Sequence, residues 1–215
     1  MKPQSYYDAD YYDNKLAKKG YGVHGLVYDK GCAPFMDLAI ILRSICRPRI
    51  VTDYGCAKGL LVAELRNIGI EARGYDFSAY AISHADSEIR KYLEQRDLCD
   101  EYEYPKCDLA ICMDTLEHID IDKIPGVLSR IYKSCDEYVF TMCGLSTNPD
   151  DAQANHEDHV TLRTYDEWVS ILTESGEFRL SDKNEKLAVA LFDVDSNKQA
   201  AENWGLKSIL LDRAR

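Results

Sequence analysis

From residue 49 onward, short apolar runs rich in β-branched side chains alternate with longer segments whose apolar residues recur at helical spacing. The first pair sets the pattern, because Arg49–Tyr54 predicts a strand and Leu60–Ile68 predicts a helix that ends at Gly69. Strands that alternate with helices form βαβ units, and the strands of such units lie parallel in one sheet. The alternation therefore predicts an α/β fold with a mostly parallel sheet and helices on both faces.

The same patterns predict seven strands, which cover residues 49–54, 70–76, 91–95, 107–114, 138–143, 177–181 and 187–193. Only a short turn separates the last two, so they are expected to form an antiparallel hairpin at the end of the sheet. Helices are expected over 34–48, 60–68, 78–90, 120–132 and 164–176. Thr164 and Glu167 have the spacing of a capping box that opens the last helix.

Three parts of the chain differ in composition. Residues 1–31 form an arm that is rich in tyrosine and contains several glycines. Two interpretations of this arm are equally supported, a lid over the domain and an ordinary amphipathic cap. Residues 32–193 form the α/β domain. Residues 194–215 are expected to be a terminal helix or a loose tail.

The charge of the chain excludes one class of partner. With 26 basic and 37 acidic residues, the net charge is −11, and no basic stripe is present that could neutralise phosphates, so nucleic acid is not expected as a substrate. Eight cysteines without a C-x-x-C pair favour free thiols in a reducing cytoplasm. No apolar segment is long enough for membrane insertion.

Polar residues follow four successive predicted strands. The turn from Asp53 to Gly59 contains two glycines, which allow a ligand to approach the backbone where a helix begins. Asp76, Asp97 and Asp114 stand at the next three strand ends. Each carboxylate alone is typical of a solvated loop, but together they predict a ligand crevice at the carboxyl edge of the sheet.

This order of segments resembles the class I S-adenosylmethionine-dependent methyltransferases, so a Rossmann-like methyltransferase fold is implied. The likeness runs from Arg49 to Phe192 and rests on the glycine turn, Gly74–Ser78, Cys107–Ala110 and Asp114–Ile119. Two shorter strings, Gly55–Leu61 and His159–Arg163 ahead of Trp168, are similar to the branch associated with glycosyltransferases and with glycan and polysaccharide biosynthesis.

The resemblance implies S-adenosyl-L-methionine as the cofactor and assigns its site residue by residue. Asp53, Gly55, Cys56 and Gly59 are placed in the turn around its amino-acid end, Asp76 on the ribose, Phe77 on the adenine face, Asp97 and Leu98 at the adenine edge, and Met113 and Asp114 near the methyl group. The chain has Ala57 where many relatives have glycine. This departure weakens the alternative of a nicotinamide-dependent dehydrogenase, which requires three closely spaced glycines.

Transfer to an alcohol requires a proton acceptor, and histidine titrates in the suitable range. His118 is the first choice for this catalytic role and His159 the second, although His118 packing in a structural role remains an alternative. Candidate acceptor-binding residues are Tyr11, Tyr12, Tyr21, His156 and His159. No metal is assigned, because the H-x-x-H spacing of His156 and His159 indicates no further ligand.

These observations predict an O-methyltransferase that methylates a hydroxyl of a sugar or glycan. An enzyme acting on a small amine or carboxylate, and a cofactor-binding partner subunit without catalysis, remain alternatives. The expected partner is a sugar or small-molecule acceptor. A homodimer and a complex with a glycosyltransferase are the two alternatives for assembly.

Overall fold

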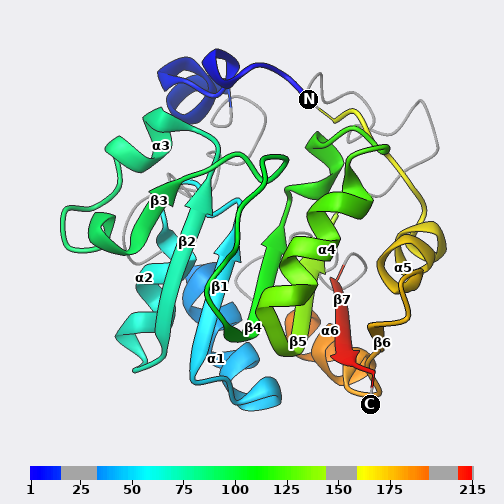
Figure 1. The fold of residues 1–215 in the computed structure, drawn as a ribbon. Helices are drawn as coiled ribbons and strands as arrows, with labels where there is room; N and C mark the ends of the chain where they lie inside the picture. The colour runs from blue at the N-terminus through cyan, green and yellow to red at the C-terminus, as the bar shows by residue number, and fades with distance from the viewer. Residues whose placement is uncertain (16–32, 144–158, 194–207, 215) are drawn as a thin grey trace.

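The computed structural model describes residues 1–15, 33–143, 159–193 and 208–214 (Figure 1). Its centre is one seven-stranded sheet in the order β3-β2-β1-β4-β5-β7-β6. The strands are β1 (Ile50–Tyr54), β2 (Glu71–Asp76), β3 (Leu93–Gln95), β4 (Cys107–Met113), β5 (Cys135–Met142), β6 (Phe178–Leu180) and β7 (Ser208–Arg213). The pairs among β1 to β5 are parallel, and β7 is antiparallel to both β5 and β6. The predicted Rossmann-like α/β fold is confirmed.

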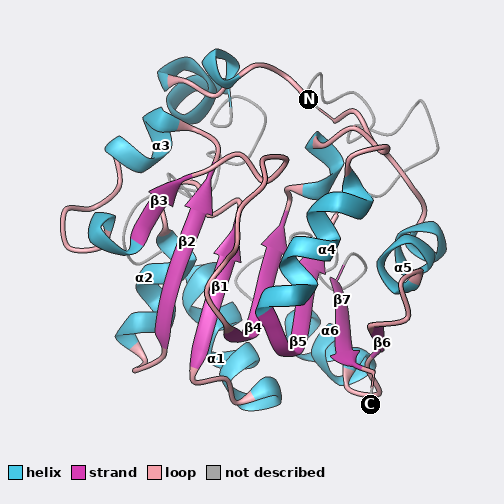
Figure 2. Ribbon diagram, in the orientation of Figure 1, coloured by secondary structure: helices cyan, strands magenta, loops and turns pink. Residues whose placement is uncertain are grey.

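Helices cover both faces of the sheet (Figure 2). They are α1 (Ala33–Cys46), α2 (Leu60–Asn67), α3 (Ala79–Ser83), α4 (Ile124–Ser134), α5 (Tyr165–Thr173) and α6 (Asn184–Asp193). Buried side chains of α1, α2 and α6 belong to one core cluster, and those of α4 and α5 belong to a second cluster. Among the described residues, none of the helices has the length and apolar character needed to cross a membrane.

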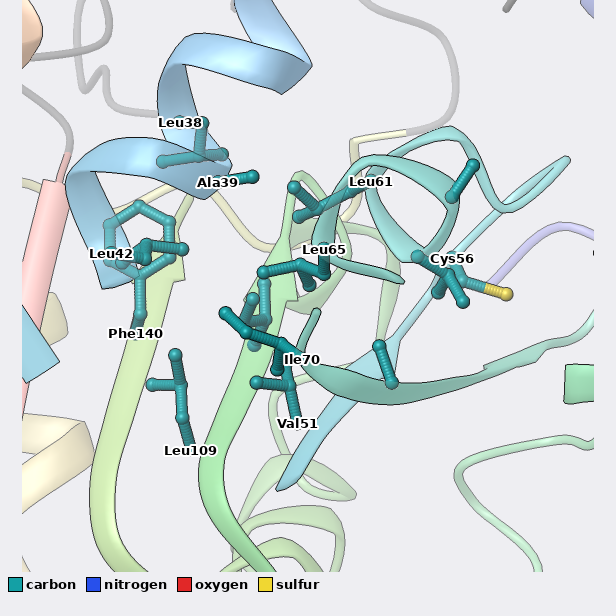
Figure 3. Packing of buried hydrophobic residues seen from close by; sticks show 14 of the residues in the cluster. Leu38, Ala39, Leu42, Val51, Cys56, Leu61, Leu65, Ile70, Leu109 and Phe140 are labelled. Atoms are coloured by element: carbon teal, nitrogen blue, oxygen red, sulfur yellow. The ribbon is translucent and has the colours of Figure 1, made fainter. Parts of the chain in front are cut away.

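Alternate residues of each strand enter the two clusters, as the pleat of a strand requires. In β4, Leu109 and Ile111 face the first cluster, whereas Ala110 and Cys112 face the second. Figure 3 shows the first cluster, in which Leu42 of α1 lies beside Phe140 of β5, and Leu61 and Leu65 of α2 lie near Val51 of β1. Because both faces of the sheet are covered, the central strand β4 is a continuous apolar run from Leu109 to Met113.

The end of the sheet differs from the prediction. Antiparallel pairing occurs there, but residues 187–193 are part of helix α6, and the second strand of the pair is β7, in the segment predicted to be a tail or helix. Leu187 and Leu191 are buried one helical turn apart, while Val189 is 54% exposed. Leu187, Val189 and Leu191 alternate as apolar residues of a strand do, but Leu187 and Leu191 also have the spacing of one helical turn. In a run this short, the sequence pattern does not distinguish a strand from a helix.

Other boundaries differ by less. The helix expected over residues 78–90 ends at Ser83, and the one expected over 120–132 runs from Ile124 to Ser134. The capping box of α5 is confirmed, because Thr164 accepts the Glu167 amide and the Glu167 carboxylate accepts the Thr164 amide. Within the arm, the structure shows a 3₁₀ turn at Gln4–Tyr6 and a π-helical turn at Asp10–Lys15.

Candidate functional site

The carboxyl ends of β1, β2 and β4 meet at one edge of the sheet. β1 lies between the other two, with Tyr54 level with Tyr75 and Asp53 level with Ile111. The chain leaves β1 toward β2 and β3, and then returns to the opposite side of β1 as β4, so the strand order reverses here. Open α/β sheets bind ligands at such a reversal.

The turn after β1 is a backbone cradle. Gly55 has φ +85° and Gly59 has φ +75°, conformations that L side chains rarely adopt. A Cβ at Gly55 would lie 2.0 Å from Thr115 Oγ1, and one at Gly59 would lie 2.6 Å from a methyl of Leu93. Both glycines are therefore required by the close approach of neighbouring elements as well as by their φ angles.

Asp76 fixes this turn from the end of β2. One carboxylate oxygen accepts the Ala57 amide and the other accepts the Ser78 amide, both at 2.7 Å. Burial raises the pKa of Asp76 to about 6, against the opposing effect of these two amides. A buried carboxylate held in this way has further lone pairs for ribose hydroxyls, so its position fits the role that the resemblance implied.

Asp53 is a second buried carboxylate next to the turn. Burial, and to a smaller extent the charge of Asp76, raises the pKa of Asp53 to about 7. A cationic ligand in the crevice would stabilise the ionised form of both carboxylates. The glycine cradle and two buried acids thus fit S-adenosylmethionine, which has a sulfonium, an ammonium and a ribose diol.

Other residues predicted for the cofactor differ in how their side chains lie. The Cys56 side chain is buried against Gly74, where an added Cβ would lie 2.6 Å from the sulfur, and its thiol donates to the Ala57 carbonyl at 3.8 Å. Leu98 is likewise a core residue. Asp97 accepts the Cys99 amide at 2.8 Å, and half-buried Phe77 follows Asp76 directly.

The floor of the crevice is the end of β4. Met113 is half-buried against the first core cluster, and Asp114 is exposed with φ +46°. The Asp114 amide donates to the carbonyl of Met142 on β5, which holds this left-handed residue in place. The backbone therefore turns sharply where the chain passes from β4 to the next loop.

That loop brings Glu117, His118 and His159 together. The Val160 and Thr161 amides both donate to the carbonyl of Glu117, at 2.9 and 3.0 Å. The His118 and His159 rings consequently meet edge to face, with centroids 4.8 Å apart. The predicted pair of histidines is thus brought together, whereas His156 lies outside the described residues.

The described part of the arm runs past the carboxyl edge of the sheet and ends beside α3 (Figure 1). The Tyr7 carbonyl accepts the Ser78 hydroxyl at 2.6 Å, and the Tyr7 ring lies 6.2 Å from that of Phe77 and 6.1 Å from that of His118. Tyr7 therefore connects the loops that follow β2 and β4.

The predicted acceptor residues Tyr11 and Tyr12 lie in the same tyrosine cluster. Tyr12 is buried and stacks at 6.1 Å on Tyr80 of α3, and the Lys58 ammonium lies 5.8 Å from its ring centroid. Tyr21 lies outside the described residues. The sequence alone indicated no function for Thr115 or Glu117, because only the packing of the loops shows their proximity to the site.

Comparisons with known proteins agree with this geometry. The family described as a methyltransferase domain matches residues 39–207. Magnesium protoporphyrin IX methyltransferase from Synechocystis, solved with S-adenosylhomocysteine, has a similar structure with a TM-score of 0.66 and 14% identity, and 98% of each chain is covered. No curated protein sequence matches.

Two further solved structures share the fold. One is a chain in the complex of the Haloferax volcanii Trm112 methyltransferase activator with a methyltransferase, with a TM-score of 0.62, 14% identity and coverage of 100% of this chain and 98% of that chain. The other is a TehB-like S-adenosylmethionine-dependent methyltransferase from Corynebacterium glutamicum, with a TM-score of 0.59, 14% identity and coverage of 83% and 88%.

Proposed function

Because this chain belongs to the S-adenosylmethionine-dependent methyltransferases, we propose that it methylates a hydroxyl group of a sugar or glycan. The observation that carries this proposal is the contact between His118 and His159 beside the floor of the crevice. An alcohol must lose its proton as its oxygen attacks, and two imidazoles at this place provide nitrogen atoms that accept or conduct that proton. An amine in its neutral form already carries the attacking lone pair, so its methylation depends less on such a proton acceptor.

The bound methyl donor supplies an electrophilic carbon and a neutral thioether leaving group. The chain's own part is to position the two reactants and to remove the proton. Asp76 holds the nucleoside end, and the turn at Gly55, next to the Asp53 carboxylate, holds the cationic amino-acid end. His118 or His159 takes up the hydroxyl proton as the oxygen–carbon bond forms. Positioning of the acceptor supplies most of the acceleration.

The arm supports a sugar as the acceptor. Tyrosine faces stack against sugar C–H groups, and Tyr7 and Tyr11 lie in one cluster with ring centroids 4.9 Å apart. Tyr7 also lies near His118, which is the side of the crevice where the acceptor must enter. The net charge of −11 favours a neutral acceptor over a polyanion. The proposal therefore gives the arm the function of a lid.

The test is a panel of neutral sugars, small amines and carboxylates, incubated with methyl-labelled donor and analysed by mass spectrometry. His118→Ala and His159→Ala are compared with His84→Ala, since His84 is an exposed histidine that directly follows α3. We expect sugar products, a loss of at least tenfold in kcat for one or both site variants, and an unchanged rate for His84→Ala. Products confined to amines or carboxylates, or donor binding without turnover, would overturn the proposal.

The form of assembly is tested on the same preparation. A structural neighbour was solved with an activator protein, and the sequence analysis left a homodimer or a glycosyltransferase partner open. Light scattering of the purified chain, with and without donor, measures its molar mass and so distinguishes a monomer from a homodimer.

A further inference from the structure

Among the described residues, Glu117, His118 and His159 direct ligand atoms toward one point. One carboxylate oxygen and one nitrogen of each ring all lie within 4.8 Å of one another. Glu117 is fully buried, and both histidines are half-buried. The three residues come from two segments that are about forty positions apart, so no local sequence spacing produces this group.

We propose that these three side chains bind one divalent first-row transition-metal ion. Tetrahedral ligands with bonds of about 2.1 Å lie about 3.4 Å from one another, so side-chain rotations that move each ligand atom by about 1 Å complete the site. Two imidazoles with one carboxylate suit ions from Mn²⁺ to Zn²⁺ better than Mg²⁺ or Ca²⁺, which prefer oxygen ligands. Three protein ligands also leave positions on the ion for an acceptor.

The backbone around the group is fixed before any ion binds. The Val160 and Thr161 amides hold the Glu117 carbonyl, and the Thr161 hydroxyl donates to the carbonyl of Ile119 at 2.7 Å. These bonds lock the segment of His159 onto the loop of Glu117 and His118. Metal sites require this kind of support, because ligands that are positioned by surrounding hydrogen bonds lose little freedom on binding.

The metal site gives the proposed function a way to remove the hydroxyl proton. This catalytic role of the ion rests on the proposed function. An acceptor hydroxyl on an open position of the ion becomes more acidic, so its proton passes to water or buffer at neutral pH. The resulting alkoxide oxygen then forms the bond to the methyl carbon while the carbon–sulfur bond breaks, and its electron pair stays on sulfur. The two histidines then assist deprotonation through the ion rather than as free bases.

Binding is tested directly on untagged full-length protein that has been stripped of metal by chelation. Co²⁺ is titrated with the visible absorption spectrum as the readout, and Mn²⁺ is titrated by electron paramagnetic resonance. We expect one ion per chain, and at least tenfold weaker binding for His118→Ala, His159→Ala and Glu117→Gln. The matched control His84→Ala is expected to bind as the original chain does.

Because Glu117 is buried, the folding of the Glu117→Gln chain is first checked by circular dichroism and by binding of S-adenosylhomocysteine. If this chain does not fold, the two histidine variants alone provide the test. The inference is overturned if the original chain binds neither ion at 1 mM, or if His118→Ala and His159→Ala bind as tightly as His84→Ala.

The sugar-methylation assay separates this inference from the proposed function. An increase of at least tenfold in the methylation rate when Mn²⁺ or Co²⁺ is added to the stripped protein supports both the metal site and the proposed function. Site-specific ion binding without any hydroxyl methylation supports the metal site and overturns the proposed function. Full hydroxyl methylation by stripped protein in the presence of a chelator overturns the metal site and leaves the proposed function standing.

Discussion

Gly55 lies directly against the side chain of Thr115, so that a methyl group on Gly55 would stand 2.0 Å from the threonine hydroxyl oxygen. That hydroxyl donates to the carbonyl of Met113 at 2.8 Å and lies 3.3 Å from the carbonyl of Tyr54. The contact joins the turn after β1 to the loop after β4. The turn after β1 and the loop after β4 are therefore closely fitted to one another at the carboxyl edge of the sheet.

Replacing Gly55 by alanine tests this contact against a matched glycine. Gly69 has the same φ of +85° but nothing within 4 Å of an added Cβ. Gly69→Ala should cost about 1 kcal/mol of unfolding free energy, from backbone strain alone. Gly55→Ala should cost about 2–4 kcal/mol, since overpacking adds to the strain. Urea unfolding measures both, and equal losses would show that Thr115 gives way without cost.

Removing the Asp76 carboxylate should weaken cofactor binding. Asp76→Ala deletes a charged acceptor next to the cradle, and the loss is expected to be about 2 kcal/mol or more in binding free energy. Calorimetry with S-adenosylhomocysteine measures it, with Asp122→Asn, an exposed acid beyond the site, as the control. An unchanged dissociation constant for a folded Asp76→Ala chain would remove Asp76 from the site.

Cofactor affinity should rise with pH. The pKa of Asp76 is raised to about 6 and that of Asp53 to about 7, and the cofactor favours the ionised form of each. From pH 6 to pH 5 the ionised fraction of Asp76 falls about fivefold and that of Asp53 about ninefold, so binding should weaken by at least about fivefold over this unit. Asp76→Asn should flatten this part of the profile, and an equally steep profile in that variant would contradict the assignment.

The stability of the ligand-free protein should show the opposite trend. Both acids have folded-state pKa values above the ordinary value of 3.8, so the stability that they contribute in the protonated form is lost as pH rises through about 6 and 7. Thermal unfolding between pH 5 and 8 measures this loss. Binding of S-adenosylhomocysteine should raise the stability more at pH 8 than at pH 5, because it favours the ionised carboxylates. A larger gain at pH 5 would contradict this prediction.

Removing residues 1–31 should abolish methyl transfer and leave cofactor binding nearly intact. The described arm contacts the crevice through the hydrogen bond between Ser78 and Tyr7 and through tyrosine rings, whereas the cradle and Asp76 belong to the sheet. Turnover and calorimetric binding are measured on the same truncated preparation. Retention of both would show that the arm is not a lid.

The capping box of α5 should be worth about 1 kcal/mol. Thr164→Ala removes the acceptor of the Glu167 amide at the helix start and should lower the unfolding free energy by that amount. The control is Thr173→Ala at the other end of the helix, where the hydroxyl only bonds back to the carbonyl of Val169. Its loss should be close to zero, and equal losses would contradict the cap.

The site was partly predictable because its cofactor half is encoded locally. A strand followed by a glycine turn, and an acid at the end of the next strand, place Gly55, Gly59 and Asp76 in one crevice once the strands are parallel. Each of these residues is at the carboxyl end of its own strand or in the turn that follows, so spacing along the chain was sufficient. The structure places all three around the same turn.

The part of the site that we propose for the acceptor was not predictable in this way. Buried Glu117 meets His159 only because a loop folds back and donates two amides to the Glu117 carbonyl, and no periodicity records such a contact. The prediction of a last strand over residues 187–193 was wrong for a related reason, since these residues fit either a strand or a helix when taken alone.

The sequence by itself determined the α/β class, the parallel strands and the cofactor turn, because short-range periodicity and glycine chemistry decide them. Only the tertiary structure decided that 208–213 completes the sheet and that His118, His159 and Glu117 share one point, because those contacts depend on pairing between segments that are distant in the chain.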